Sequence, residues 1–525
     1  MINGHEIMMG RTANEVVANL PTRVSHRVWQ WIKDTPDAIA LQEAARSWTY
    51  ADLGLAVNDA RQHLIDHQVR GGDRLILVCE NACVLAAFVL AASDLDAWVV
   101  PVNARMSDTE LDAILDDCQP RHVIYTVEAS SDARKHAEQR SATFTQHPLL
   151  GEFAYGGTLD STPEPVCQRG QDQIFAMIYT SGTTGKPKGV MLTHNNVAFV
   201  ASISAANRCL SPASRVYSVL PMSHAFGLTS ACMAGMMSGA TTYLEPRFNP
   251  EVCLNTLLEQ KITMLMGVPP MYSALIEAIK TRGLRPSNLS LSYLSVGGAP
   301  LDPETKSSTE SFFGLPLHNG FGLTETSPTI SQVRFNEGLK DCSCGRPNPG
   351  VEVRLVKADG SDAAIGEIGE LWTRGPHVMK GYFRKPELTQ KVLNAEGWFN
   401  TEDLALQDAA GNLTIAGRTK ELIVRSGFNV YPAEIEAVLN AHPLITQSAV
   451  IGISRQGDEE VLAYVQAMPG AAISEEDLHA YCKEKLTGYK RPSKITLMDA
   501  LPASNTGKLL KARLKEMARL SIQQS

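Results

Sequence analysis

The chain has 525 residues, of which 44% are hydrophobic and 20% are charged, and its formal net charge is −8 at pH 7. This length is enough for roughly two to four globular domains, each able to bury its own core. The acidic balance argues against a general nucleic-acid binder, so a small anionic substrate has to be held by local groups.

The amino-terminal part of the chain predicts neither a secretory signal nor a membrane span. Residues 1–10 contain His5 and Glu6 and no apolar core, which is unlike a signal peptide. The longest apolar run, Ala82 to Ala92, is too short to cross a bilayer and predicts a buried helix. Ten cysteines without regular pairing favour reduced thiols over a zinc site. We therefore expect a cytoplasmic protein.

Helical and strand patterns alternate along most of the chain, which is typical of an α/β fold with parallel strand pairing. Ser107 to Glu110 has the sequence of a helix-capping box, and Ser474 opens a second predicted helix. The turn-forming segment 411–417 surrounds a short predicted strand, and about a hundred residues follow it, enough for a small α+β domain. We therefore predict a domain of residues 1–419 and a second of residues 420–525.

The most informative segment runs from Tyr179 to Val190. The five apolar residues from Phe175 to Tyr179 predict a buried strand. The next ten residues are mostly Gly, Ser, Thr, Lys and Pro, which neither a helix nor a strand favours. Such a loop offers hydroxyls, backbone N–H groups and ammonium groups to a polyphosphate. It is not a Walker A loop, because only two residues separate Gly182 from Gly185.

Polar residues also gather at several later predicted turns. Ser295 to Pro300 is a strand end that runs into a Gly-Gly turn, where glycines let a flat ligand approach the backbone. The other segments of this kind are Asn319–Glu325, Trp398–Asp403, Gly417–Lys420 and Leu501–Lys508. Taken singly, each is more often a structural turn or a solvated surface.

Taken together and in order, these segments resemble the motifs of the adenylate-forming enzymes, the superfamily of acyl-CoA synthetases, peptide-synthetase adenylation domains and firefly luciferase. The resemblance implies a large N-terminal domain of mixed sheets flanked by helices, a hinge at Lys420, and a small mobile α+β C-terminal domain. It also implies an ATP site that consists of Thr180, Ser181, Gly182, Thr183, Thr184, Lys188, Gly298, Ala299, Pro300, Asn319, Gly320, Phe321, Gly322, Thr324, Asp403, Arg418 and Lys508.

The resemblance assigns roles within this ATP site. Phe321 is expected to stack on adenine, Thr324 to bond the α-phosphate, and Glu325 to hold Mg²⁺, a hard cation that prefers oxygen ligands. Asp403 is expected to accept both ribose hydroxyls. Many family members have Tyr where Phe321 stands, and the residue before Asp403 is usually Gly, whereas this chain has Glu402.

The C-terminal domain is implied to serve two half-reactions. Lys508 is assigned to adenylation, where its ammonium would stabilise charge on the carboxylate and α-phosphate oxygens. Ser426, Gly427 and Phe428 belong to a segment that resembles the lining of the pantetheine tunnel. Lys490 lies in a short basic cluster that suits either CoA phosphates or a solvated face.

The segment Leu220 to Leu228 matches the family segment whose histidine gates or lines the acyl site, which assigns His224 to that role. Amino-acid-activating relatives generally carry Asp there, and none occurs between Leu220 and Ser230, which disfavours an amino acid substrate. Methionine suits an adaptable apolar pocket but also fills ordinary cores. Methionines concentrate nearby at Met222, Met233, Met236, Met237, Met264, Met266 and Met271.

The predicted function is an ATP-dependent carboxylic acid–CoA ligase that forms an acyl-AMP intermediate from a largely apolar acid, fatty or aromatic. Its cofactors and co-substrates would be ATP, Mg²⁺ and CoA, with no nucleic acid partner. Three alternatives remain open: an acyl-AMP ligase that loads a carrier protein, a luciferase-like oxygenase, and a non-catalytic nucleotide-binding regulator. The sequence leaves the oligomeric state open.

Overall fold

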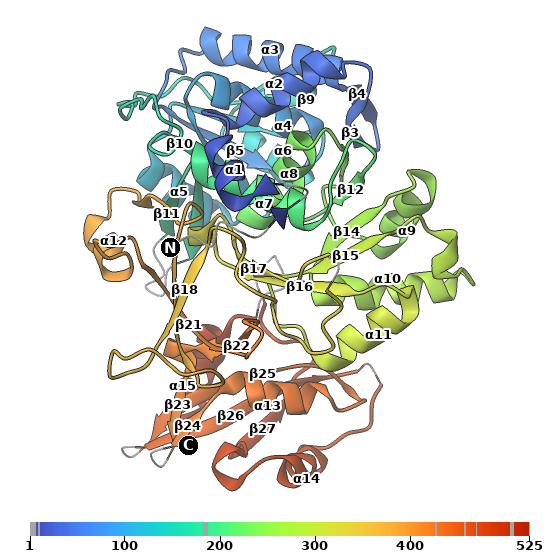
Figure 1. Cartoon of the computed structure of the whole chain (residues 1–525), viewed down its shortest axis with the longest axis vertical. Coiled ribbons are helices and arrows are strands. Elements are labelled where there is room, and N and C mark those ends of the chain that lie inside the picture. Colours follow the sequence, from blue (N-terminus) through green and yellow to red (C-terminus); the bar gives the residue numbers. More distant parts are fainter. Residues whose placement is uncertain are drawn as a thin grey trace.

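The structure is a computed structural model that describes residues 7–8, 11–181, 187–335, 337–425, 428–455, 458–468, 470–503 and 509–523. A large N-terminal part contains several mixed sheets with helices packed on them, and a smaller β-rich C-terminal part lies at one end of the molecule (Figure 1). The expected fold class is confirmed.

Two large sheets form the framework of the N-terminal part. The first has eight strands in the order β20 (Gly381–Tyr382), β11 (Pro187–Thr193), β10 (Ile174–Ser181), β6 (Trp98–Asn103), β5 (Arg74–Cys79), β7 (His122–Tyr125), β9 (Gly151–Tyr155) and β8 (Thr143–His147). The second also has eight, in the order β17 (Thr329–Gln332), β16 (Leu317–Gly322), β15 (Tyr293–Val296), β14 (Met264–Gly267), β12 (Arg215–Ser218), β13 (Thr241–Leu244), β3 (Ile39–Glu43) and β4 (Arg46–Thr49).

Smaller sheets complete the N-terminal part. A four-stranded antiparallel sheet has the order β18 (Glu352–Val356), β19 (Gly369–Arg374), β21 (Phe399–Gln407) and β22 (Leu413–Arg418). The short strands β1 (Ile7–Met8) and β2 (Arg11–Thr12) pair with each other.

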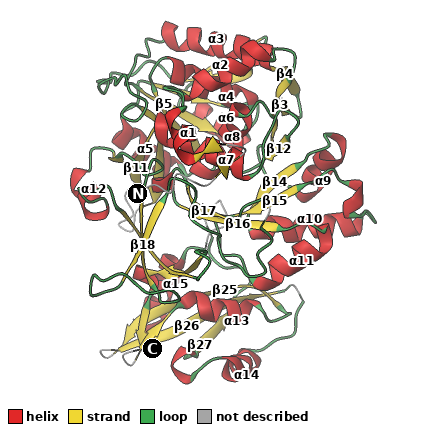
Figure 2. Ribbon diagram, in the orientation of Figure 1, coloured by secondary structure: helices red, strands yellow, loops and turns green. Residues whose placement is uncertain are grey.

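Helices cover both faces of the large sheets (Figure 2). The α-helices of the N-terminal part are α1 (Ala13–Ala18), α2 (Val24–Asp34), α3 (Tyr50–Asp66), α4 (Cys83–Asp94), α5 (Asp108–Cys118), α6 (Ser131–Gln139), α7 (His194–Asn207), α8 (Ala234–Met237), α9 (Pro250–Glu259), α10 (Pro269–Thr281), α11 (Pro303–Phe313) and α12 (Pro386–Val392). A π-helix, η1 (Phe226–Met233), precedes α8, and short 3₁₀ turns are η2 (Pro286–Asn288), η3 (Thr324–Thr326) and η4 (Thr419–Glu421).

The layering follows from strands that are apolar on both faces. In β5 every residue is buried, and Leu75 and Leu77 pack into a core shared with α3, α4, α7 and α8. The alternate residues Ile76 and Val78 pack on the opposite face, against α5 and α6. Because side chains alternate across a strand, a parallel sheet with such strands needs helices on both sides. The second large sheet contributes to the same central core and packs its other face against α9, α10 and α11.

Several local predictions are confirmed. The apolar run of Ala82 to Ala92 lies almost entirely in the buried helix α4. Ser107 caps α5 with a reciprocal capping box, and Ser474 does the same for a helix near the C-terminus. In both, the cap hydroxyl accepts a backbone N–H that the first helical turn leaves without a partner.

The C-terminal part has its own apolar core. A three-stranded sheet of β25 (Ile445–Arg455), β26 (Asp458–Ala467) and β27 (Lys494–Leu497) is flanked by the two-stranded sheet of β23 (Ile423–Arg425) and β24 (Phe428–Val430). Its helices are α13 (Pro432–Asn440), α14 (Glu475–Lys485), the 3₁₀ turn η5 (Gly488–Lys490) and α15 (Lys511–Gln523). Apolar side chains on the two faces of the three-stranded sheet form separate clusters. Among the helices of the described residues, we find none with the length and apolarity needed to cross a membrane.

Candidate active site

The segment expected to hold polyphosphate forms a hairpin between β10 and β11. Thr180 pairs with Lys188 and Ser181 pairs with Pro187 across antiparallel strands. The expectation that all ten residues avoid regular structure was therefore wrong. The reason is that ladder hydrogen bonds to a neighbouring strand outweigh a weak local β-propensity. The tip, residues 182–186, lies outside the described residues, so the assignments of Gly182, Thr183 and Thr184 stay predictions.

Lys188 and the carboxylate expected to hold magnesium, Glu325, contact the same tyrosine, Tyr382. The Lys188 ammonium lies 4.7 Å from the ring centroid of Tyr382, the last residue of the edge strand β20. The hydroxyl of Tyr382 donates a hydrogen bond of 2.9 Å to Oε1 of Glu325 in η3. Burial raises the pKa of Tyr382, and the adjacent Glu325 carboxylate raises it further, so the hydroxyl remains a donor at neutral pH. One tyrosine therefore contacts a cation through its ring and a carboxylate through its hydroxyl.

An ion pair between Lys385 and Asp117 holds the base of the hairpin. The hydroxyl of Tyr179 and the ammonium of Lys385 each donate to a different oxygen of Asp117, both at 2.7 Å. Lys385 also donates to the carbonyl of Pro187 at 2.9 Å. These contacts fix the start of β11, and with it the position of Lys188.

The turn expected to border adenine lies beside the end of β16. Val296 of β15 pairs with Asn319, so the glycines after β15 reach the level of Gly320. A Cβ at Gly297 would lie 3.1 Å from the Gly320 carbonyl oxygen, and Gly298 has φ of +77°. This close approach and the left-handed backbone explain the two glycines. Gly298 and Pro300 are exposed and Ala299 is half-buried, so the turn is accessible to a ligand.

The residues at the end of β16 differ in burial and in the contacts that they make. Asn319 is buried and donates to the carbonyl of Cys342 at 2.8 Å, a structural role. Phe321 is half-buried and packs on the apolar core of the four-stranded sheet. A Cβ at Gly322 would lie 1.8 Å from the Pro328 carbonyl oxygen, so only glycine fits there. Thr324 follows in η3 and is half-buried.

Asp403 and Arg418 meet across the four-stranded sheet. They are register partners of β21 and β22, and Nε of Arg418 donates to Oδ1 of Asp403 at 3.0 Å. Asp403 is 3% exposed, whereas the Arg418 side chain is 45% exposed. The predicted ribose acceptor and its predicted cationic neighbour are therefore adjacent, and the guanidinium keeps a face open to solvent.

Glu402 stands where the adenylate-forming family usually has glycine, and its backbone keeps a glycine-like conformation with φ of +58°. Its backbone N–H is held by the side-chain oxygen of Asn400 at 2.8 Å. Its carboxylate pairs with the ammonium of Lys420 at 2.7 Å. The turn is therefore retained in spite of the substitution, and Lys420, the expected hinge, contacts the strand that carries Asp403.

His224 lies two residues before the π-helix η1. Asn81 positions this segment, because its amide donates to the carbonyls of Ser218 and Leu220 and its oxygen accepts from the N–H of Met222. Burial lowers the pKa of His224 to about 4, and the nearby Arg105 lowers it further, so the imidazole is neutral at pH 7. π-Helices occur often at functional sites.

Most of the methionines expected to line an apolar pocket are buried in the central core instead. Met222, Met233, Met236, Met237, Met264 and Met266 belong to the buried central core, and Met271 is half-buried beside it. The half-buried apolar residues next to the Gly297–Gly298 turn are different ones. A Cβ at Gly298 would lie 3.9 Å from Val268 and 4.0 Å from Phe226.

Two of the residues assigned to CoA, Phe428 in β24 and Lys490 in η5, belong to the C-terminal part, and β24 lies apart from β10 and β11 (Figure 1). Phe428 is 55% exposed, and its ring stacks on Tyr489 with centroids 4.7 Å apart. Lys490 pairs with Glu434 at 2.5 Å, so a phosphate would compete with that carboxylate. Ser426, Gly427 and Lys508 lie outside the described residues, and their assignments stay predictions.

The residues at η3 fit a magnesium ion. Glu325 is half-buried, and the Tyr382 hydroxyl orients one of its two carboxylate oxygens. Magnesium in nucleotide sites is commonly held by one or two carboxylates together with phosphates and waters. Glu325 supplies one such oriented carboxylate.

Sequence reasoning missed Tyr382 and Asp117. Neither lies in a motif segment, and each acts through a contact with a residue far away in the chain. The glycine before Tyr382 was the available signal, because Gly381 has φ of +145° and lets the chain enter the edge strand.

Comparison with known proteins decides the family. The model of the AMP-binding enzyme family matches residues 28–383, and that of the AMP-binding enzyme C-terminal domain matches residues 434–508. This chain belongs to the AMP-binding enzymes.

Relatives of this AMP-binding enzyme are similar over nearly their whole length. A feruloyl-CoA synthase from Amycolatopsis is 33% identical over 92% of this chain and 96% of its own. A 2-succinylbenzoate–CoA ligase from Geobacillus kaustophilus is 31% identical over 93% and 97%. An O-succinylbenzoate coenzyme A synthetase from Bacillus subtilis, solved in complex with ATP and a magnesium ion, superposes with a TM-score of 0.79 at 28% identity, over 93% and 99% of the two chains. The adenylate-forming enzyme class indicated by the motifs is confirmed.

Proposed function

We propose that this AMP-binding enzyme is an ATP-dependent carboxylic acid–CoA ligase that works through an acyl-AMP intermediate. The observation that carries the proposal is the Lys188–Tyr382–Glu325 arrangement, in which one tyrosine contacts a cation through its ring and orients a carboxylate through its hydroxyl. The buried carboxylate of Asp403 with Arg418 supplies a matching acceptor for a ribose. CoA ligases and CoA synthetases among the relatives support the same reaction class.

In the first half-reaction the acid carboxylate attacks the α-phosphorus of ATP. An oxygen–phosphorus bond forms to the acid, the bond from the α-phosphorus to the bridging oxygen breaks, and pyrophosphate leaves. Mg²⁺ held by Glu325 would neutralise phosphate charge when bound. Lys188 and Lys508 contribute positive charge to the same centre, and Thr324 donates to the α-phosphate.

In the second half-reaction the thiolate of CoA attacks the carbonyl carbon of the acyl-AMP. A carbon–sulfur bond forms, the carbon–oxygen bond to phosphate breaks, and AMP leaves. The β23–β24 hairpin has to approach the acyl-AMP for this step, because it lies away from β10 and β11 (Figure 1). The boundary proposed at Lys420 supplies the hinge, since the chain there passes from β22 to β23 through the short turn η4.

The acid is proposed to be largely apolar, fatty or aromatic. Phe226 and Val268 adjoin the Gly297–Gly298 turn, and Leu323 is a further half-buried apolar side chain beside η3. His224 is neutral at pH 7 because burial and Arg105 hold its pKa down. A neutral imidazole among apolar side chains offers no charge to pair with a substrate amine.

The deciding experiment is a screen of pyrophosphate release over fatty, benzoic and cinnamic acids, with and without CoA. The proposal expects acid-dependent pyrophosphate, AMP rather than ADP as the nucleotide product, and an acyl-CoA thioester. Adenylate that accumulates and transfers only to a carrier protein would favour the acyl-AMP ligase instead. Oxygen uptake on the adenylate would favour the oxygenase, and nucleotide binding with no acid-dependent turnover would favour the regulator.

Lys508→Ala separates the two half-reactions. This variant should release pyrophosphate far more slowly than the wild type, yet form thioester from supplied acyl-AMP and CoA. Unimpaired pyrophosphate release would remove Lys508 from the adenylation step.

A further inference from the structure

Three histidines converge at the amino ends of the parallel strands of the first large sheet. His63 lies in the last turn of α3, His67 follows at the C-terminal end of that helix, and His122 begins β7. Residues four positions apart lie on the same face of a helix, which brings His63 and His67 to the same side. The strand β7 brings His122 to them from a segment more than fifty residues away, with Nε2 of His63 and Nε2 of His122 only 3.3 Å apart.

The separations of the ring nitrogens suit a shared metal ion. Each histidine offers one ligand nitrogen, and the three nitrogens lie within 4.8 Å of one another. Zinc binds imidazole nitrogen at about 2.0–2.1 Å in a tetrahedron, which places two such ligands about 3.3 Å apart. The pair His63 and His122 already has this separation. The third nitrogen has to move by at most about 1.5 Å.

The orientation of His67 is fixed by a hydrogen bond of the kind that metal-binding histidines use. Its Nδ1 donates to the carbonyl of His63 at 2.8 Å, so in the neutral ring Nε2 carries the lone pair. A backbone carbonyl bound to the second ring nitrogen fixes the tautomer and the ring plane of a metal ligand. The helix end therefore presents a defined ligand atom.

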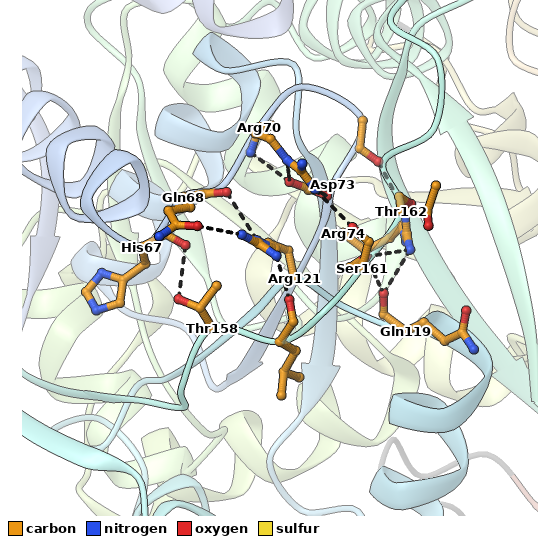
Figure 3. A network of polar contacts seen from close by, with 12 residues as sticks. His67, Gln68, Arg70, Asp73, Arg74, Gln119, Arg121, Thr158, Ser161 and Thr162 are labelled. Carbon is orange, nitrogen blue, oxygen red and sulfur yellow. Dashed lines mark hydrogen bonds and ion pairs between the residues drawn. The ribbon is translucent and has the colours of Figure 1, made fainter.

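The surrounding backbone is tied down by a polar network (Figure 3). Thr158 donates to the carbonyl of His67 at 3.2 Å. Arg121, the residue before His122, donates to the backbone carbonyl of Gln68 at 3.2 Å and to its side-chain oxygen at 3.0 Å. These bonds join the end of α3 to the start of β7, so they fix the relative position of the two elements that carry the histidines.

Aromatic side chains form the wall of the cluster. The ring of His63 makes edge contacts with Phe88, Phe153 and Tyr155. His122 is fully buried, and burial lowers its pKa to about 3. Burial likewise lowers the pKa of His63 to about 4. Neutral imidazole is the form that binds metals.

Charged groups of both signs lie near the cluster. The carboxylate of Asp66 is close enough to His63 to raise its pKa, against the lowering by burial, His67 and His147. His147 accepts backbone N–H groups through Nδ1 and lies 3.8 Å from Asp59 through Nε2. The titratable groups that act on His63 are therefore imidazoles and a carboxylate, and the cationic Arg121 lies near His122.

The cluster lies at the amino ends of the parallel strands, opposite to the ends that adjoin the proposed acyl site. Strands β5, β6 and β7 are parallel, and Asn81 and Arg105 follow the carboxyl ends of β5 and β6. His122 begins β7 and therefore lies at the amino end. Because Arg105, at the carboxyl end of β6, is the neighbour of His224, we expect an ion at the opposite strand ends to act on folding and not on adenylation.

We propose that His63, His67 and His122 form a binding site for a transition metal ion, with Zn²⁺ as the cation that suits three imidazoles best. A water or an exchangeable ligand would complete the tetrahedron. The ion would cross-link α3 to β7, and it would stabilise the N-terminal part because the unfolded chain does not hold the three ligands together.

The test uses the full-length protein after treatment with a chelator. Co²⁺ is titrated in first, because tetrahedral cobalt absorbs visible light, and Zn²⁺ is then added in competition. The expected result is one Co²⁺ per chain with tetrahedral absorption, loss of that absorption on addition of Zn²⁺, and a higher Tm with one equivalent of Zn²⁺.

Phenylalanine variants test whether Co²⁺ binding depends on these histidines, and they keep an aromatic ring at each position. His67→Phe and His122→Phe should each weaken Co²⁺ binding by at least about a hundredfold and abolish the Tm rise. His26→Phe, which removes an exposed histidine, is the matched control and should bind Co²⁺ as the wild type does. His67 is half-buried and lies at a helix end, so His67→Phe is expected to fold. It therefore tests the site even if His122→Phe does not fold. No tetrahedral Co²⁺ absorption in the wild type, or unchanged affinity in His67→Phe, would overturn the proposal.

Discussion

The hydroxyl of Tyr382 donates to Oε1 of Glu325 at 2.9 Å, while the ring of the same tyrosine contacts the ammonium of Lys188. Tyr382 therefore orients the carboxylate proposed to hold magnesium, although it lies outside the motif segments. Its hydrogen bond and its ring contact can be removed separately, which makes it a sharp test of the site.

Tyr382→Phe removes the hydrogen bond to Glu325 and keeps the ring beside Lys188. Loss of a partner that orients a metal ligand typically lowers metal affinity or activity about 10–100-fold. We expect this loss in pyrophosphate release at limiting Mg²⁺, with partial recovery at high Mg²⁺. Tyr382→Leu, which also removes the ring, should be more impaired. Wild-type magnesium dependence in the phenylalanine variant would refute an orienting role.

Asp403→Asn removes the charged acceptor proposed for the ribose hydroxyls. Hydrogen bonds to a charged group contribute about 1.5–3 kcal/mol, and a ribose contact is made equally in the ground and transition states. The KM for ATP should therefore rise by about tenfold or more, while kcat changes less. Initial rates over a range of ATP concentrations measure this split. A fall in kcat at unchanged KM would place Asp403 in the chemical step instead.

Phe428→Ala removes the exposed half of the Phe428–Tyr489 stack. Adenylation should be unchanged, because this pair lies away from β10 and β11 (Figure 1). Thioester formation from acyl-AMP and CoA should slow by about tenfold, as expected for loss of an aromatic contact of about 0.5–1.5 kcal/mol together with buried area. Single-turnover measurements of the two steps give the comparison, and Phe428→Tyr serves as the conservative control. Equal loss in both steps would contradict a role limited to CoA.

Substitutions at Glu402 test how its left-handed backbone conformation affects stability. Its φ is +58°, a conformation that costs non-glycine residues about 1–2 kcal/mol, and more for β-branched side chains. Its exposed ion pair with Lys420 contributes at most about 1 kcal/mol. Glu402→Gly should therefore leave the free energy of unfolding within about 1 kcal/mol of the wild type, and Glu402→Val should lower it by more. Urea denaturation of the two variants measures the difference, and an equal effect of both would exclude backbone strain as the cause.

The lowered pKa of His224 predicts how the free energy of unfolding depends on pH. Burial and Arg105 lower its folded pKa from 6.5 to about 4, so the unfolded chain binds more protons between these values. Stability therefore falls as the pH is lowered through this window, by up to about 1.4 kcal/mol per pH unit from this group. His224→Phe should show a shallower fall when unfolding is measured at intervals from pH 7 to pH 4. An identical slope in variant and wild type would show that His224 is not neutral in the folded protein.

Local features were predictable because their energetics are local. The apolar run at α4, the capping boxes at Ser107 and Ser474, and the Gly-Gly turn at Gly298 depend on residues within a few positions of one another. The motif segments likewise gave the enzyme family, since each is contiguous in the chain. The extent of the phosphate loop was wrong because strand pairing between Thr180 and Lys188 is decided by hydrogen bonds to a partner, not by composition.

The sequence by itself determined the class of fold, the enzyme family and the positions of the short turns, because periodicity, capping and contiguous motifs express short-range physics. Only the tertiary structure decided that Tyr382 meets Glu325 across 57 positions and that His122 meets His63 across 59. Both contacts follow from strand order, in which β20 joins the sheet at β11 and β7 lies beside β5. Strand order depends on how all the elements pack together, and no local pattern around Tyr382 or His122 records it.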